Sequence, residues 1–188
     1  MPSSVRYVRP FLAVLAICVA PWPAAAQATT EPKTVTITPF LGSVFGTSED
    51  LGGSLGLGVA MTYDLTSRLG VEGELAHAFD VLGDDANVDL SVTNVSGNAV
   101  YNFPVPRVTP YATFGIGIER TSLDVKSPDP LALYAPGSTE VSYNFGGGVR
   151  YPVSELFVAR ADVRRFQAND LAPDYWRVYG GLTWWIKR

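Results

Sequence analysis

Alternation of apolar and polar residues is the dominant pattern along the chain from Thr34 onward. The odd-numbered positions from 55 to 63 are Leu, Leu, Val, Met and Tyr, whereas the positions between them are Gly, Gly, Ala and Thr. A period of two residues is typical of a β-strand that has one apolar and one polar face. No stretch beyond Thr34 has the spacing of an amphipathic helix. The sequence therefore predicts an all-β protein.

Eight segments carry this pattern, each about 10–14 residues long, well above the usual strand of about 5–6. They are residues 34–46, 53–64, 69–80, 89–102, 109–120, 139–150, 155–166 and 174–187. Short links follow the second, fourth and sixth segments, and longer polar, acidic loops follow the first, third, fifth and seventh. Short turns at one rim and long loops at the other predict a closed eight-stranded antiparallel up-and-down transmembrane β-barrel.

The polar face of these segments indicates what surrounds the barrel. It is rich in glycine and carries charged residues on four of the predicted strands: Glu72, Glu74, Arg150, Arg160, Asp162, Arg164 and Arg177. Small and charged side chains fit inside a narrow barrel whose apolar face contacts lipid. The opposite arrangement would bury these charges in an apolar setting and expose an apolar belt to water. We therefore expect a membrane-spanning barrel whose lumen is filled by a structural Glu–Arg network.

Aromatic residues support this interpretation by their placement near both ends of the strands. One group lies beside the short turns and the other near the long loops: Tyr63, Tyr101, Phe103, Tyr151, Phe157 and Trp184 in the first, Phe45, Phe79, Tyr175 and Trp176 in the second. Two aromatic girdles around an apolar band are typical of barrels that span a bilayer.

Several segments together resemble a known family. They read VTNVSGNAVYNF, TPYATFGIGI, YNFGGGVRYPVS, ARADVRRF and WRVYGGLTWW, in this order along the chain. Their order and spacing resemble the outer-membrane β-barrel family that includes the OmpA/OmpX-type barrels and the small, porin-like, opacity-like surface proteins. The resemblance implies a protein of the Gram-negative outer membrane. It also implies a non-enzymatic role in adhesion, stability or surface interaction.

The N-terminal segment has the features of a cleaved signal peptide. Arg6 and Arg9 precede an apolar run at 11–20, and three alanines precede Gln27. We therefore predict a signal peptide over 1–26, a flexible lead-in over 27–33 and the barrel domain over 34–188. The chain's single cysteine falls within the signal peptide, so the remaining chain has no disulfide or thiolate site.

Net charge argues against a nucleic-acid partner. The chain has 14 basic and 18 acidic residues. Arg6 and Arg9 are the only charged residues in the predicted signal peptide, so its removal leaves 12 basic and 18 acidic residues. Nucleic-acid binding is instead associated with a basic surface.

Candidate catalytic chemistry is limited to the single histidine. His77 has lipid-facing parity near the loop end, and Ser91 on the neighbouring strand is the nearest lipid-side hydroxyl that the sequence suggests. A histidine-based hydrolase needs its base within hydrogen-bond reach of the nucleophile. The His-x-Ser-Asn motif of lipid A deacylases is not present. We therefore predict no enzymatic activity and no cofactor.

Acidic residues gather in two of the long loops. They are Glu49 and Asp50 in one loop and Asp84, Asp85 and Asp89 in the other. Such carboxylates can bind Ca²⁺ or bridge through divalent ions to lipopolysaccharide phosphates, but no twelve-residue calcium-loop pattern accompanies them. We interpret both groups as solvated loop faces and predict no metal site.

These observations predict a barrel with a structural or surface-interaction role. The N-terminus is expected in the periplasm, with the loops near Asp50, Asp85, Asp129 and Asp170 outside the cell. Expected partners are outer-membrane lipid and lipopolysaccharide, the barrel assembly machinery and an extracellular protein or surface ligand, with the barrel itself a monomer. Two alternatives remain: a small-solute pore, which a filled eight-stranded lumen disfavours, and, more distantly, a lipid A-modifying enzyme.

Overall fold

The structure, a computed structural model, describes six stretches of the chain and eight strands within them. The described residues are 30–46, 54–79, 88–103, 105–125, 137–168 and 174–187. The strands are β1 (Thr34–Gly46), β2 (Ser54–Asp64), β3 (Leu69–Ala78), β4 (Val88–Asn102), β5 (Thr109–Val125), β6 (Thr139–Pro152), β7 (Phe157–Ala168) and β8 (Tyr175–Lys187). Nowhere in these stretches is there a helix long and apolar enough to cross a membrane. The predicted signal peptide lies outside them.

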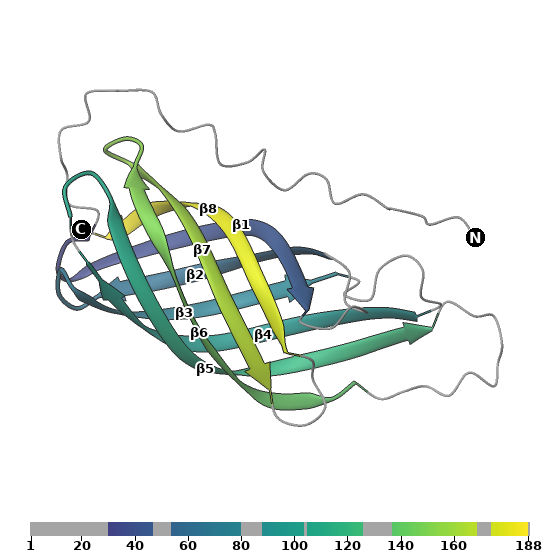
Figure 1. Ribbon diagram of the computed structural model, residues 1–188. Helices are drawn as coiled ribbons and strands as arrows, with labels where there is room; N and C mark the ends of the chain where they lie inside the picture. The colour runs from purple at the N-terminus through teal and green to yellow at the C-terminus, as the bar shows by residue number, and fades with distance from the viewer. Residues whose placement is uncertain are drawn as a thin grey trace, which may run out of the picture.

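The eight strands form one closed barrel. Each strand pairs antiparallel with the next in the chain, and β8 returns to pair with β1, as Figure 1 shows. The β1–β8 seam has one irregularity, a register shift between Val35 and Thr36. Closure gives every strand a partner on both sides and leaves no open sheet edge. The predicted fold class is confirmed.

Most predicted strand boundaries lie within three residues of the observed ones. The largest difference is at β5, which was expected to end at residue 120 and continues to Val125. Residues 121–125 of this extension pair with residues 88–92 of β4. Their backbone N–H and C=O groups are therefore hydrogen-bonded across the two strands. Polar side chains near a loop therefore led the sequence analysis to end this strand too early.

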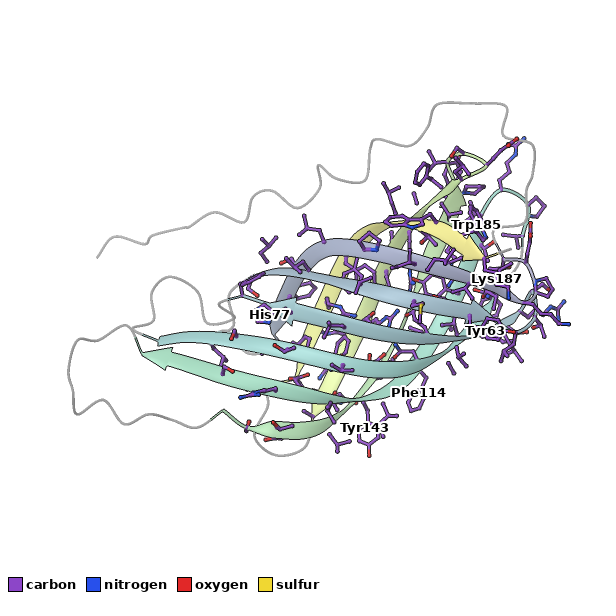
Figure 2. The ribbon with its side chains drawn as sticks, turned by 180° about the vertical axis from the view of Figure 1, so that it is seen from behind. Tyr63, His77, Phe114, Tyr143, Trp185 and Lys187 are labelled. Carbon is purple, nitrogen blue, oxygen red and sulfur yellow. The ribbon has the colours of Figure 1, made fainter. Side chains whose placement is uncertain are left out.

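The barrel has an apolar outer face and a polar inner face. Phe114 and Ile116 on β5 are 61% and 53% exposed, and Phe114 projects from the outer surface in Figure 2. On the inner face Arg164 is 0% exposed and Glu72 is 2% exposed. Only a lipid environment makes an exposed apolar belt and a charged interior favourable together. The predicted assignment of the two faces is the observed one.

A glycine on β5 makes room for a contact across the inner wall. Asn144 on β6 donates a hydrogen bond of 2.9 Å from Nδ2 to Oδ1 of Asn98 on β4, and this bond passes over Gly115. A Cβ atom at Gly115 would lie 2.7 Å from Asn144 Nδ2, too close for any side chain. Gly115 therefore allows two non-adjacent strands to be bridged.

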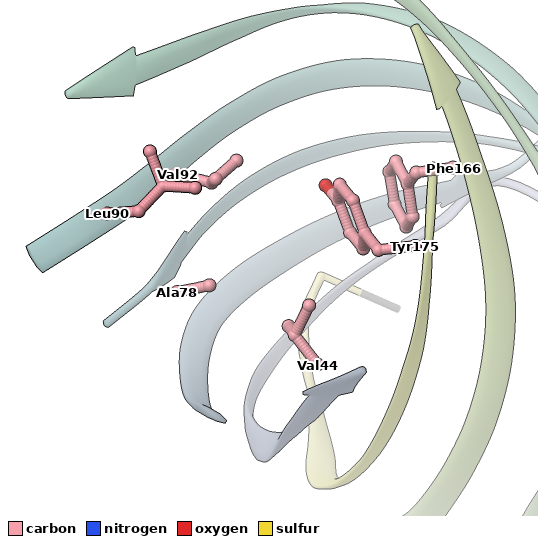
Figure 3. Packing of buried hydrophobic residues seen from close by; sticks show 6 residues of the cluster. All are labelled: Val44, Ala78, Leu90, Val92, Phe166 and Tyr175. Carbon is pink, nitrogen blue, oxygen red and sulfur yellow. The ribbon is translucent and has the colours of Figure 1, made fainter. Parts of the chain in front are cut away.

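Apolar residues also occupy part of the lumen, which the sequence analysis did not anticipate. One cluster, shown in Figure 3, contains Val44, Ala78, Leu90, Val92, Phe166 and Tyr175. The expected place of Tyr175 in the outer aromatic girdle is therefore wrong, since this ring is 3% exposed and faces the lumen. In this cluster the rings of Phe166 and Tyr175 stack with centroids 4.9 Å apart. In a second cluster Phe40 stacks on Tyr179 at 4.2 Å. The interior is therefore packed by aromatic rings as well as by ion pairs.

The described part of the lead-in lies against the barrel. The Thr30 side chain is buried and donates a 3.0 Å hydrogen bond to the carbonyl of Ser67, in the turn between β2 and β3. The amide of Lys33 donates to the carbonyl of Asp64 at 2.7 Å. These bonds hold residues 30–33 at the short-turn end of the barrel.

The face assignment predicts a large cost for a charge on the outer belt. We expect Ile116→Arg to lower the free energy of unfolding in lipid vesicles by about 2–4 kcal/mol, because the guanidinium would lie near the bilayer midplane. Leu156→Arg is the control, since Leu156 is 67% exposed in the turn after β6 and the new charge there remains in water. Wild-type stability for Ile116→Arg, measured by denaturant titration, would reverse the assignment.

Candidate functional site

The candidate site is the barrel interior, where strand alternation directs charged side chains from opposite walls toward each other. Glu72 and Glu74 are successive inward residues of β3, and their side chains have no exposed surface. Arg160, Asp162 and Arg164 are successive inward residues of β7, equally buried. Because an eight-stranded barrel is narrow, these groups meet across the lumen.

Glu72 lies at the centre of the network. Its Oε2 atom is 2.5 Å from Arg160 NH1, and its Oε1 atom is 2.7 Å from Arg164 NH2. The hydroxyl of Thr62, on β2, donates a further hydrogen bond of 2.8 Å to Oε2. Both carboxylate oxygens are therefore occupied by charged or polar donors, as a buried carboxylate requires.

Asp162 and Glu74 complete the cluster. Asp162 lies between two arginines, 3.1 Å from Arg160 NH2 and 3.0 Å from Arg164 Nε. Glu74 accepts from Arg177 and lies 3.2 Å from Arg164 NH1. Three carboxylates thus face three guanidinium groups, so the cluster is electrically neutral. Neutrality and multiple hydrogen bonds are what make buried ions tolerable.

Arg150 belongs to a separate pair nearer the short turns. Its NH1 atom is 3.8 Å from Asp64 Oδ1 and donates a 3.1 Å hydrogen bond to Asn102 Oδ1. Six of the seven predicted lumen residues therefore share one ion-pair cluster, whereas Arg150, the register partner of Arg160, lies 5.0 Å from the Tyr111 ring centroid and pairs with Asp64 instead. Asp64 was missed by the sequence analysis, although it has the inward parity of Thr62 on the same strand.

Two tyrosines, also missed, hold the arginines in place. Arg160 Nε donates to the Tyr111 hydroxyl at 2.7 Å, and its guanidinium lies 4.9 Å from the Tyr111 ring centroid. Arg164 NH2 donates to the Tyr179 hydroxyl at 3.0 Å. The Tyr111 hydroxyl in turn donates to Asp162. Such contacts add cation–π attraction to the ion pairs, and inward parity was the available sequence signal.

A further inward carboxylate lies nearer the loop end of the barrel. Glu119 on β5 is 1% exposed and accepts a 3.0 Å hydrogen bond from the hydroxyl of Tyr175 on β8. The sequence analysis did not select Glu119, although it alternates with the outward residues Ile116 and Ile118. Buried carboxylates thus occur from Asp64, through the neutral cluster, to Glu119, beside the two apolar clusters of the lumen.

The structure corrects one detail of the predicted histidine environment. His77 Nδ1 is 2.9 Å from Thr93 Oγ1, and its ring meets Phe79 edge-on at 4.5 Å. The expectation that Ser91 is the nearest hydroxyl is wrong, because Thr93 is the register partner of His77. His77 lies on the outer face, as expected, away from the buried carboxylates.

No metal centre is found in the stretches that the structure describes, since no group of three histidine, cysteine, aspartate or glutamate side chains there could hold an ion. Glu49, Asp50, Asp84 and Asp85 lie outside those stretches. Asp89, which was expected in the loop, lies in β4 in register with Asp124, and only its backbone is described. The predicted lack of a metal site in these loops therefore stays a prediction.

A closed antiparallel barrel with an apolar belt and a charged, packed lumen defines an integral membrane protein of the outer-membrane type. A family model described as the outer membrane protein beta-barrel domain matches residues 11–182. The chain belongs to this family of bacterial outer-membrane β-barrels, which confirms the resemblance inferred from its strands.

Solved structures of bacterial surface proteins have the same fold. Neisserial surface protein A matches with a TM-score of 0.65 and 16% identity, over 80% of this chain and 96% of that chain. The outer membrane protein OprG from Pseudomonas aeruginosa matches with a TM-score of 0.59 and 13% identity, over 84% of this chain and 99% of that chain. Ail, the attachment invasion locus protein of Yersinia pestis, matches with a TM-score of 0.54 and 17% identity, over 80% of this chain and 97% of that chain. No curated protein matches the chain by sequence.

The network predicts that an inner arginine contributes far more to the free energy of unfolding than an outer arginine does. We expect Arg160→Ala to lower the free energy of unfolding by about 3–5 kcal/mol, because Glu72 and Asp162 would keep a buried charge without full compensation. Arg165→Ala, which removes a partly exposed outer pair with Asp174 at 2.8 Å, should cost about 0–1 kcal/mol. Denaturant titration in vesicles measures both.

A double variant tests whether charge balance is the cause. Arg160→Ala combined with Glu72→Gln leaves two carboxylates and two guanidinium groups in the cluster. We expect it to recover part of the stability lost in Arg160→Ala alone, since residues in one network couple. If the stability loss of the double variant equals the sum of the losses of Arg160→Ala and Glu72→Gln, the two side chains contribute independently.

Proposed function

We propose that this protein is a non-enzymatic surface barrel, with its lumen closed by the Glu–Arg network and its long loops displayed outside the cell for adhesion or other surface interaction. The observation that supports this most directly is the neutral cluster of Glu72, Glu74, Asp162, Arg160, Arg164 and Arg177, which crosses the lumen from β3 to β7 and β8. A wall-to-wall cluster of buried side chains acts as a plug rather than as the lining of a channel.

Packing around the cluster supports a closed lumen. The guanidinium groups of Arg160, Arg164 and Arg177 lie within 6 Å of the Tyr179 ring centroid, at 5.8, 5.8 and 5.1 Å. Beside Arg177, Asn94 and Tyr175 the structure leaves a cavity of only about 10 Å³, enough for about one water molecule. Passage of a solute through this section would require the buried ion pairs to separate.

In this proposal, the long loops bind the partner, and the closed barrel only carries them. Ail is named for attachment and invasion, and a role of that kind is proposed here for a chain that shares its fold at 17% identity. In the described residues, His77 has a threonine and a phenylalanine as its side-chain partners rather than a carboxylate. The base–carboxylate arrangement of a lipid A-modifying hydrolase is therefore not formed there.

Conductance measurements test the closed lumen. We expect the purified barrel to give no stable single-channel steps in a planar bilayer. The variant Arg164→Ser with Glu72→Ser removes one charge of each sign and two large side chains, so it should open a water-filled path and give measurable steps. Arg165→Ser with Asp174→Ser, the matched outer pair, should stay silent. Reproducible steps from the wild-type barrel would favour the small-solute pore.

Surface labelling tests the orientation. A peptide tag inserted beside Asp129, between β5 and β6, should bind antibody on intact cells, because long loops of such barrels lie outside. A tag beside Glu155, in the short turn between β6 and β7, should bind antibody only after the outer membrane is permeabilised. The reverse pattern would show that the barrel is inserted the other way.

A further inference from the structure

The outer surface of β3, β4 and β5 carries a row of hydrogen-bond donors near the loop end. Strand register places His77 beside Thr93 and Thr93 beside Arg120. In the next row toward the loops, Ser91 is in register with Ser122. The aliphatic belt begins one row below, at Leu75, Val95 and Ile118, all about half exposed. These donors therefore lie at the edge of the apolar belt, at the depth of lipid headgroups.

Arg120 differs from the other outward arginine at this end of the barrel. Arg165 is neutralised by Asp174 at 2.8 Å, and its guanidinium lies over the Trp176 ring at 5.5 Å. Arg120 is exposed, and among the side chains that the structure describes no carboxylate lies within ion-pair distance of it. An exposed guanidinium at headgroup depth, with no carboxylate partner among the described side chains, is complementary to a phosphate group.

The His77 side chain is also oriented so that it can donate a hydrogen bond to a phosphate group. Its Nδ1 atom is bonded to Thr93 Oγ1 at 2.9 Å, and its ring is held against Phe79. When the Thr93 hydroxyl donates to Nδ1, the ring carries its hydrogen on Nε2, on the side away from Thr93. His77 then presents an N–H donor on the same outer row as the guanidinium of Arg120.

A hollow lies in the aliphatic belt below this row. It has a volume of about 520 Å³, and its walls include Met61, Tyr63, Val71 and Ala99. Its floor is formed by Gly73 and Gly97, which are in register, and a Cβ atom at either position would meet nothing within 4 Å. Neither glycine is required by the packing of the protein itself. In Figure 2, His77 and Tyr63 mark the two ends of the outer surface that contains the hollow.

The distance between the donors and the hollow fits one lipid molecule. His77 and Gly73 are four residues apart on β3, which corresponds to about 13 Å along a strand. Half the thickness of a bilayer hydrocarbon core is about 15 Å. A lipid whose headgroup is held at His77 can therefore lay an acyl chain over Leu75 and Val95 into the hollow, where dispersion contacts replace an empty space.

We propose that this outer surface binds lipid A, the phosphorylated and acylated anchor of lipopolysaccharide. A phosphate group is held by the Nε2–H group of His77 and by the guanidinium of Arg120, with Thr93 orienting the histidine ring, and one acyl chain occupies the hollow above Gly73 and Gly97. This assignment rests on the proposed orientation, which places the long-loop end in the outer leaflet. The phosphate supplies a counter-charge for Arg120, which has none among the described side chains, and the acyl chain fills the space above the two glycines.

Native mass spectrometry of the folded barrel in detergent tests the site, with synthetic bis-phosphorylated lipid A as the probe. We expect one bound lipid A, with affinity lowered about tenfold by Arg120→Gln, since a charge-assisted contact is lost. The lipid A affinity of the matched control, Arg165→Gln, should stay within about twofold of the wild-type affinity. Lipid A without phosphates should bind wild type and Arg120→Gln equally weakly.

Filling the hollow tests the acyl-chain half of the site. Gly97→Leu should weaken lipid A binding, whereas Ala161→Leu, an outward position on β7, should not. Circular dichroism of each variant establishes that it is folded, and Arg120→Gln provides the test if a leucine variant is not. Equal lipid A affinity in wild type, Arg120→Gln and Gly97→Leu would overturn the proposal. Because this measurement is made in detergent, its outcome is independent of conductance and of loop orientation.

Discussion

Backbone hydrogen bonding in an apolar bilayer is the constraint on which the rest of this structure depends. Lipid offers no partner to a free N–H or C=O group, so the sheet must close, here through β1 and β8. Closure of eight strands leaves a narrow interior that side chains fill. The narrow interior then requires that its charges balance, because water cannot solvate them. The neutral cluster around Glu72 is the result.

The fold could be predicted because strand alternation and loop length are local features. The two-residue period predicts all eight strands that the structure describes, and it alone places Glu72, Arg160 and Arg164 on the inner face. The extension of β5 to Val125 was missed, because pairing with β4 is a long-range property that overrides local polarity. The sequence analysis also selected charged residues only, and so passed over Tyr111 and Tyr179.

Which inner residues contact each other could not be predicted from parity. Arg150 has the same parity as Arg160, yet it pairs with Asp64 rather than with Glu72. Its partner depends on height along the tilted strands and on which wall faces which, and both follow from the register of the whole barrel. The same limit applies to the outer face, where register placed Thr93 rather than Ser91 beside His77.

The connection between Glu72 and Arg160 joins residues 88 positions apart in the chain. Contacts of this span can form only after β3 and β7 have been brought to facing walls, so we expect them to form late in folding. Interactions that are absent from the folding transition state slow unfolding without accelerating folding. We therefore expect the ion-pair network to slow unfolding of the closed barrel more than it accelerates folding, and so to prolong the lifetime of the assembled protein.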